Sequence, residues 1–543
     1  MNLRYFKNMV PAAAILLGTG LSSCTGDLDV TPIDPSSTMT PSEPELFTKC
    51  YATMALAGNY GGDGQGAPDP NYVCDINRLD GGTTGFVRQL WNANELTTDE
   101  AICSWGDPGI PEFNYNTWGD SHPMLEGFYN RLYTSISFCN HYLDVCNGVD
   151  ATRTAEVRFL RALFYYHLMD CYGNVPFATE LMSTSPEQIQ RADLFKWIES
   201  ELLEVKDQMQ TPTVRISSDT GYGRADQDAA NMLLARLYLN AEIYTGTAHW
   251  NEAKEYAEKV INGPHKLWSG TKNGWSAYEM LFMGDNGENG SSVEAVLPLL
   301  GDGQKTTSYG TSMFLMSSCW SKDMDENGDF GMVEKFWNGN RARHQLILKF
   351  FPNDDAPAVN MKNMASAASD DRALFFGIDR TVSASTPSEF ESGFSVGKFR
   401  NTYSDGSTPH STIFPDADYF LMRSAEAYLI AAEADARLNG GTTTSTGTNY
   451  INALRQRAHA VTVSSYSLNQ ILDERSRELY FEGFRRTDLI RYGYYGGQNS
   501  SQYVWEWKGG SESGASLPAY RNLFAIPASD MTANPNLKQN EGY

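Results

Sequence analysis

Apolar residues recur at helical spacing in several long segments of the chain. In the clearest one, 224–244, Leu233, Leu234, Leu237 and Tyr238 fall on one face with a period of 3.6 residues. Comparable stripes run through 126–146, 154–172, 193–209, 249–262, 418–438, 446–460 and 467–482. Together these patterns predict amphipathic helices, each of which must bury one face.

The predicted helices follow one another closely enough to pack as pairs. Pairs rich in Ala, Leu and Tyr resemble tetratricopeptide repeats, which stack because one pair alone cannot cover its apolar face. We therefore predict a mainly α fold of about four helical pairs, with the scaffold in about 126–262 and 418–492.

The third pair is interrupted by 263–417, a stretch rich in Gly, Ser, Asn and aromatic residues that lacks long helical periods. With 58–125, this stretch forms the predicted loop-rich, mixed region. Loops carried by a rigid scaffold are where ligand sites usually lie, so we expect the ligand-binding region here.

The N-terminus has the layout of a bacterial lipoprotein signal. Arg4 and Lys7 precede an apolar run and a small-residue stretch that closes in Leu21-Ser-Ser-Cys24. We predict a signal peptide over 1–23, lipidation of Cys24, a flexible lipidated tether over 24–45 and one folded domain over 46–543. The lipid anchor would hold the protein on a membrane outside the cytoplasm.

Charge and cysteine content narrow the function further. The net charge of -24 and the pI near 4.7 argue against binding to nucleic acid, which needs clustered Lys and Arg. The cysteines other than Cys24 are odd in number and scattered, so they do not form a disulfide framework. We predict mostly buried free thiols, with one disulfide such as Cys74 to Cys103 as the alternative.

Motifs for catalysis are missing from the sequence. It contains no HExxH, GxSxG or P-loop pattern and no zinc-type spacing of Cys and His, and we expect no organic cofactor. A binding protein is therefore favoured over an enzyme. A glycosidase stays open as an alternative, because it needs only two suitably placed carboxylates.

One acidic segment fits the pattern of a calcium loop, D-x-[DN]-x-[DN]-G-x5-E, at every defined position. Such loops supply oxygen ligands at alternate positions and end in a bidentate Glu. The predicted ligands of a structural Ca²⁺ ion are Asp323, Asp325, Asn327, the carbonyl of Asp329, and Glu334. The alternative is an acidic turn that stays in water.

Large aromatic residues gather in the loop-rich region. They are Trp91, Trp105, Trp118, Tyr309, Trp320 and Trp337. Flat rings can hold the C–H faces of sugars, while neighbouring polar groups bind the hydroxyls. Core packing is the alternative for each ring. A charged run over 473–488 is expected to be a structural helix with ion pairs.

Several segments of the chain resemble hallmarks of the SusD (starch-utilisation system D) family. They are the charged run continued to 493, 155–162, 172–176, 233–240, 423–428, 524–527 and 539–543. The resemblance implies a surface lipoprotein of the outer membrane with a tetratricopeptide-like scaffold. It also implies a TonB-dependent transporter as partner, to which the protein delivers glycans or peptides.

The resemblance is strongest to starch-binding members, especially in 94–100 and 297–310. It implies that Trp105 and Tyr309 are rings of an aromatic arc, that Arg88 and Asp80 bind sugar hydroxyls, and that Trp320 is the third ring. One departure is Asp107-Pro108, where an asparagine is expected. We predict a surface protein that captures starch-like α-glucans. Another glycan or a peptide is the alternative ligand.

Overall fold

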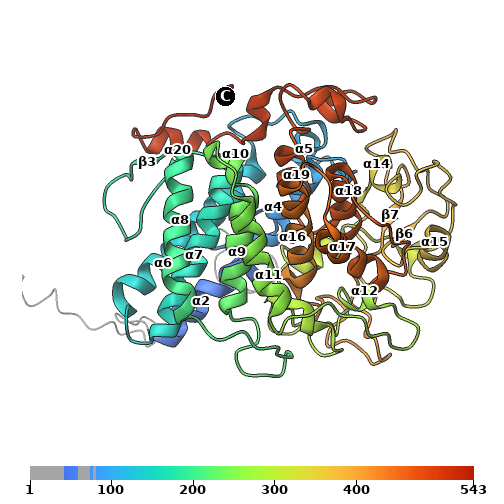
Figure 1. Ribbon diagram of the computed structural model, residues 1–543, viewed down its shortest axis with the longest axis horizontal. Helices are drawn as coiled ribbons and strands as arrows, with labels where there is room; N and C mark the ends of the chain where they lie inside the picture. The colour runs from blue at the N-terminus through green and yellow to red at the C-terminus, as the bar shows by residue number, and fades with distance from the viewer. Residues whose placement is uncertain (1–41, 59–73, 77–80) are drawn as a thin grey trace, which may run out of the picture. The chain divides into compact units, whose positions relative to one another are not determined.

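The computed structural model describes residues 42–58, 74–76 and 81–543 (Figure 1). The predicted signal peptide, the lipidation site Cys24, most of the tether and Asp80 lie outside the described residues. Among the helices that the structure describes, none combines the length and the apolar character needed to cross a membrane.

Long helices form the scaffold, and each one coincides with a predicted apolar stripe. They are α6 (Pro123–Cys146), α7 (Ala151–Tyr172), α8 (Arg191–Val205), α9 (Gln227–Leu239), α11 (Trp250–Asn262), α16 (Ser424–Leu438), α17 (Ser445–Arg457) and α18 (Leu468–Leu479). The prediction of a mainly α fold is confirmed. One boundary was wrong: Tyr419–Arg423 form strand β8 ahead of α16, because they pair with β4 (Ala295–Leu299).

Polar side chains mark where several of these helices begin. Asp150 accepts a hydrogen bond from the Arg153 N–H at the start of α7, and Asp226 does the same for the first turn of α9. Ser467 and Gln470 form a capping box at the start of α18. Each cap satisfies N–H groups that have no partner inside the helix.

Neighbouring helices pack in the order that a stack of pairs requires. Helix α6 packs on α7, α7 on α8, α9 on α11, and α16 on both α17 and α18. The interrupted pair also forms, since α11 packs on α16 although 263–417 separate them in the sequence. These helices run side by side through the molecule, with the loop-rich yellow segments to one side (Figure 1).

The loop-rich region is built from short elements around a small antiparallel sheet. The sheet has the order β1-β5-β7-β6, formed by Ala101–Cys103, Asn340–Ala342, Ser395–Val396 and Phe375–Phe376. Its short helices are α3 (Gly81–Thr84), α4 (Phe86–Trp91), the π-helix η3 (Asn92–Leu96), α5 (Ile110–Tyr115), α12 (Ala277–Met280), η5 (Ser291–Glu294), α13 (Ser312–Ser317), η6 (Lys322–Met324), α14 (His344–Ile347) and α15 (Met361–Ala368).

The remaining elements lie at the start of the described chain, between the long helices and after them. They are α2 (Glu43–Ala55), β2 (Val175–Pro176), β3 (Gln188–Ile189), η4 (Lys206–Gln208), α10 (Ala241–Thr245), α19 (Arg485–Arg491), η7 (Ser500–Gln502), η8 (Lys508–Gly510), η9 (Ala519–Asn522) and α20 (Ala528–Ala533).

The prediction of one helix over 473–488 was wrong, because α18 ends at Leu479 and α19 begins at Arg485. The charged side chains are structural, as expected, but most of them are buried and pair with other segments rather than along one helix. Glu478 and Glu482 accept hydrogen bonds from Arg423 at 2.6 and 2.7 Å, and all three side chains are almost fully buried. Arg485 pairs with Asp99 at 2.7 Å in the same way. Buried charges are tolerated only when they are paired and hydrogen-bonded, so this network must form for the core to close.

The cysteines after Cys24 are all free thiols, which confirms the prediction of mostly buried free thiols. Six are buried, and Cys74 is partly exposed. The alternative disulfide between Cys74 and Cys103 is not formed: Cys74 lies 2.9 Å from the hydroxyl of Thr84, while Cys103 is buried in β1.

Candidate functional site

A surface hollow of about 450 Å³ lies in the loop-rich region. Its described lining consists of Gly82, Arg88, Trp105, Asp107, Tyr309, Lys335 and Trp337. The small sheet explains why distant residues meet there. Cys103 at the end of β1 pairs with Asn340 at the start of β5. The segment that follows β1 and the segment that precedes β5 therefore leave the sheet at the same end of these two strands.

Three partly exposed rings dominate the hollow. The indole N–H of Trp105 donates a hydrogen bond to the carbonyl oxygen of Trp337 at 3.1 Å, and the two ring centroids lie 6.3 Å apart at 57°. Trp337 in turn lies 5.8 Å from the Tyr309 ring at 65°. The rings therefore form a row of tilted surfaces, and this row can contact the apolar faces of a flat, extended ligand.

Two glycine positions hold this row in place. A Cβ atom on Gly339 would come within 2.3 Å of the Trp105 indole, so only glycine lets the ring lie on this backbone. The Cα of Gly310 would lie 2.5 Å from a Cβ on Gly85, which precedes α4. That close approach brings the Tyr309 segment against the helix that carries Arg88.

Polar groups surround the rings. The Arg88 guanidinium carbon lies 5.8 Å from the Trp105 ring, and the Lys335 ammonium lies 5.9 Å from the Tyr309 ring. The carboxylate of Asp107 is exposed at the rim. The hollow thus offers hydrogen-bond donors and one described carboxylate acceptor beside apolar faces, which suits a ligand rich in hydroxyl groups.

The structure brings together three of the five residues that the family resemblance implied. Arg88, Trp105 and Tyr309 line one hollow, and Asp80 lies outside the described residues. Trp320 does not belong to the hollow: it is 0% exposed, stacks on Phe330 at 5.0 Å and donates its indole N–H to the Phe399 carbonyl.

Trp337 takes the place that was expected for Trp320. The sequence marked it as one of the loop aromatics, and its position three residues before β5 is the signal that a sheet prediction could have used. Of the other loop aromatics, Trp91 and Trp118 are each 1% exposed and belong to the core. Asp107, which departs from the family pattern, lines the hollow.

The acidic loop over 323–334 has partners within the protein. Both carboxylate oxygens of Asp323 accept hydrogen bonds from Arg380, and Asp325 accepts one from the Phe330 N–H at 3.0 Å. Glu334 and Asn327 are exposed. Calcium binding by Asp323, Asp325, Asn327, Asp329 and Glu334 stays a prediction.

A different group of side chains has ligand atoms close enough to share a metal ion. Among the described residues, Asp302, His410 and Asp416 each offer one such atom, all within 4.8 Å of one another. His410 already bonds Asp416 at 2.9 Å through Nδ1, and Asp302 pairs with Lys305 at 3.0 Å. Carboxylate oxygen and imidazole nitrogen suit several divalent cations.

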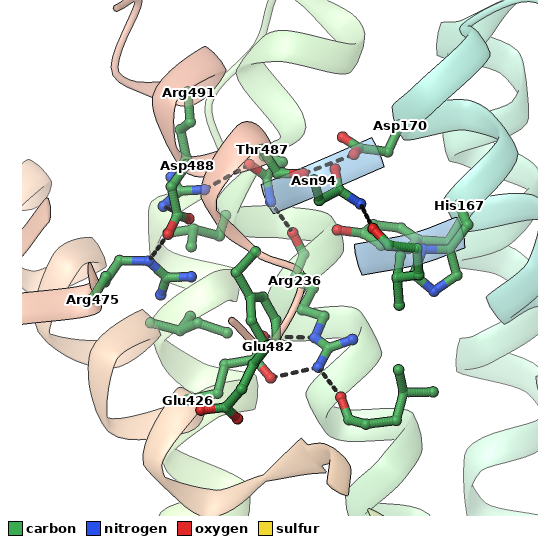
Figure 2. A pocket seen from close by; sticks show the side chains of 18 residues that line it. Asn94, His167, Asp170, Arg236, Glu426, Arg475, Glu482, Thr487, Asp488 and Arg491 are labelled. Carbon is green, nitrogen blue, oxygen red and sulfur yellow. Dashed lines mark hydrogen bonds and ion pairs between the residues drawn. The ribbon is translucent and has the colours of Figure 1, made fainter. Parts of the chain in front are cut away.

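A further pocket lies inside the scaffold, between α7, α9, α19 and η3 (Figure 2). Its volume of about 40 Å³ fits a few water molecules and no sugar ring. Arg236 pairs there with Glu426 at 2.6 Å. Burial, and then Arg236, lower the pKa of His167 to about 3, so this histidine is neutral. This pocket is part of the charged core.

Comparisons with known proteins identify the family of the chain. The profile of the SusD family matches residues 246–543. The starch-binding protein SusD of Bacteroides thetaiotaomicron is 35% identical over an alignment of 582 positions that covers 100% of both chains. The chain belongs to the SusD family. This membership agrees with the mainly α fold of the chain.

Solved structures show the same SusD fold. A SusD-like protein of Bacteroides fragilis aligns with a TM-score of 0.67 at 17% identity, over 95% of this chain and 100% of that one. Surface glycan-binding protein A of Bacteroides thetaiotaomicron, in complex with laminarihexaose, aligns with a TM-score of 0.62 at 19% identity, over 92% and 98%. At these identities the likeness concerns the fold.

Proposed function

We propose that the protein captures glycans at the hollow formed by Trp105, Tyr309 and Trp337. The row of tilted, partly exposed rings beside Arg88, Lys335 and Asp107 is the observation that carries this proposal. If each ring contributes on the order of 0.5–1.5 kcal/mol, three rings together give about 1.5–4.5 kcal/mol, which supports only binding in the millimolar range or weaker. Weak and repeated contacts suit a polymeric ligand.

Starch-like α-glucan is the ligand class that we favour. The full-length relative named for starch binding is 35% identical, which is close enough to compare the sites residue by residue. A different glycan is the alternative ligand, because one solved relative is in complex with laminarihexaose. A peptide is less well supported, because the hollow presents rings rather than an open strand edge.

The cellular role follows from the family resemblance and the N-terminal sequence. We propose that Cys24 carries the lipid anchor on the outer surface of the outer membrane. There the protein would pass its glycan to a TonB-dependent transporter. The tether over 24–45 would give the folded part reach from the membrane.

Capture without turnover agrees best with the described lining. Most glycosidases place two carboxylates on either side of the bond that they cleave. Among the described residues that line the hollow, Asp107 is the sole carboxylate. Glycan hydrolysis is therefore the weaker candidate.

Affinity gels test the proposal directly. The soluble protein that begins after Cys24 is run in native gels containing amylopectin, pullulan, dextran, levan or xylan. We expect retardation by amylopectin and pullulan, and its loss in the double variant Trp105→Ala with Tyr309→Ala. The double variant should keep its melting temperature within a few degrees, since both rings are partly exposed.

A matched control removes two rings elsewhere. Trp250→Ala with Tyr520→Ala changes partly exposed aromatic residues outside the hollow and should leave retardation unchanged. Retention of binding in the Trp105 and Tyr309 variant would refute the site. Release of reducing ends during incubation with amylopectin would instead favour hydrolysis.

A further inference from the structure

A second cavity, of about 490 Å³, opens in the loop-rich region, and it shares no lining residue with the hollow around Trp105. Its lining comes from 273–279, 324–329, 360–376, Arg400 and His459. We propose that this cavity is a second saccharide site, which takes a short neutral stretch of glycan. The inference rests on the proposed glycan-binding function and extends it.

The strongest indication is a buried cation with spare hydrogen-bond donors. Arg400 lines the cavity and is only 1% exposed. Its Nη2 donates to the Gly397 carbonyl at 2.8 Å and lies 3.7 Å from Glu279, while Nε has no partner. An arginine carries five N–H donors, and leaving buried donors unused is costly. Nε itself is closed off, so the hydroxyl groups of a ligand would bind the guanidinium donors that face the cavity.

An aromatic ring and a free acceptor complete the site. The Arg400 guanidinium carbon lies 4.9 Å from the ring of Trp275, which is partly exposed in the cavity and whose indole N–H has no hydrogen-bond partner. The carboxylate of Asp329 also has no hydrogen-bond partner, although its backbone oxygen accepts from Thr402 at 2.6 Å. The Asp329 carboxylate, which lines the cavity, is thus open to the hydroxyl groups of a ligand.

The charge of the lining excludes anionic sugars. Carboxylates outnumber cations in the lining, with Glu279, Glu326, Asp329, Asp370 and Asp371 facing Lys362, Arg400 and His459. An anionic sugar would be repelled by this excess. Asp370 is held by Arg372 at 2.8 Å and Asp371 by His459 at 2.7 Å. Glu326 accepts from Asn360 at 3.2 Å and Glu279 from Ser276 at 2.8 Å, so Asp329 is left as an acceptor for ligand hydroxyls.

The segment 329–337 contributes residues to the lining of both cavities. Asp329 lines the second cavity, and Lys335 and Trp337, a few residues later, line the hollow. Two weak sites on one protein raise its retention on a polymer far above that of either site, provided that one chain can reach both.

Fluorine NMR separates the two sites in one protein. The soluble protein that begins after Cys24 is labelled with 5-fluorotryptophan, and Trp275→Phe and Trp337→Phe assign the two resonances. Maltohexaose, laminarihexaose and xylohexaose are titrated to millimolar concentration. We expect at least one of them to shift the Trp275 resonance. This shift should persist in Trp105→Ala with Tyr309→Ala, where the Trp337 resonance no longer responds.

Variants of the lining sharpen the test. Asp329→Ala should weaken the Trp275 response roughly three- to tenfold. Asp355→Ala, an exposed carboxylate outside the lining, should leave it unchanged. A Trp337 response without any Trp275 response overturns the second site and leaves the proposed function intact. If neither resonance responds to any of the three hexasaccharides, both the second site and the proposed function are overturned. A Trp275 response only to a lysine-rich peptide assigns the cavity to cationic ligands and refutes the saccharide site.

Discussion

The charged core and the aromatic hollow use polar groups in opposite ways. In the core, Arg423 binds Glu294, Glu478 and Glu482, and all four side chains are at most 2% exposed. In the hollow, Arg88, Lys335 and Asp107 lie beside partly exposed rings, where water or a ligand can reach them. The hallmark charges thus belong to the scaffold, and the ligand contacts belong to the loops.

The pKa values of the core follow from this arrangement. Burial alone would raise the pKa of Glu478, but Arg457, Arg423 and Arg372 together lower it to about 2. Burial would also raise the pKa of Glu433, but Arg491 and Arg437 lower it to about 2. These carboxylates stay ionised because each one is surrounded by guanidinium groups.

Breaking the core network should give the largest effect. Arg423→Met leaves Glu294, Glu478 and Glu482 short of a cation, and we expect a loss of about 3–5 kcal/mol in the free energy of unfolding. Urea unfolding followed by circular dichroism measures it. Lys196→Met, which removes an exposed ion pair with Asp193, should change the same quantity by less than about 1 kcal/mol. Equal losses in the two variants would contradict the comparison.

Acid should have the second-largest effect, because it protonates the paired carboxylates of the core. The lowered pKa values of Glu433 and Glu478 stabilise the fold fully above pH 4.5, the ordinary value, and this stabilisation is lost as the pH falls towards 2. We expect the melting temperature to fall steeply across that window. Glu478→Gln should flatten the pH profile of the melting temperature. An unchanged melting temperature between pH 5 and 2.5 would show that the network does not stabilise the fold.

Substitutions of one tryptophan in the hollow and one in the core should have smaller effects. Trp337→Ala should weaken glycan binding roughly three- to tenfold, because one ring of the row is lost. Trp320→Phe should leave binding unchanged and lower the melting temperature, because it replaces the buried indole by a smaller ring and removes the hydrogen bond to Phe399. Isothermal titration with maltohexaose and thermal unfolding measure the two effects. The reverse pattern would restore Trp320 as the third ring.

Calcium should have the smallest effect. If the acidic loop binds Ca²⁺ with the millimolar affinity common in extracellular modules, millimolar Ca²⁺ should add about 1 kcal/mol or less to stability. Differential scanning fluorimetry in calcium and in chelator measures it. Loss of the thermal shift in Asp325→Ala and Glu334→Ala supports the loop. Loss in Asp416→Ala alone moves the ion to the group formed by Asp302, His410 and Asp416.

Much of the fold could be predicted, because its long helices carry periodic apolar stripes. The start of α16 could not, because Tyr419–Arg423 are as apolar as a helix and only their pairing with β4 makes them a strand. At the site, Trp105 and Tyr309 were predictable by resemblance. Trp337 and Trp320 were not distinguishable, since the choice between them depends on the edge of a sheet with strands of two or three residues.

The packing of α11 on α16 has an evolutionary and a folding consequence. The two ends of 263–417 return to neighbouring helices, and β4 and β8 pair near the base of this insertion. A segment anchored in this way can diverge in length and sequence while the helices around it keep their contacts. The same topology slows folding, since 161 residues, Gly263 to Arg423, separate α11 from α16 and their contact must close this long loop.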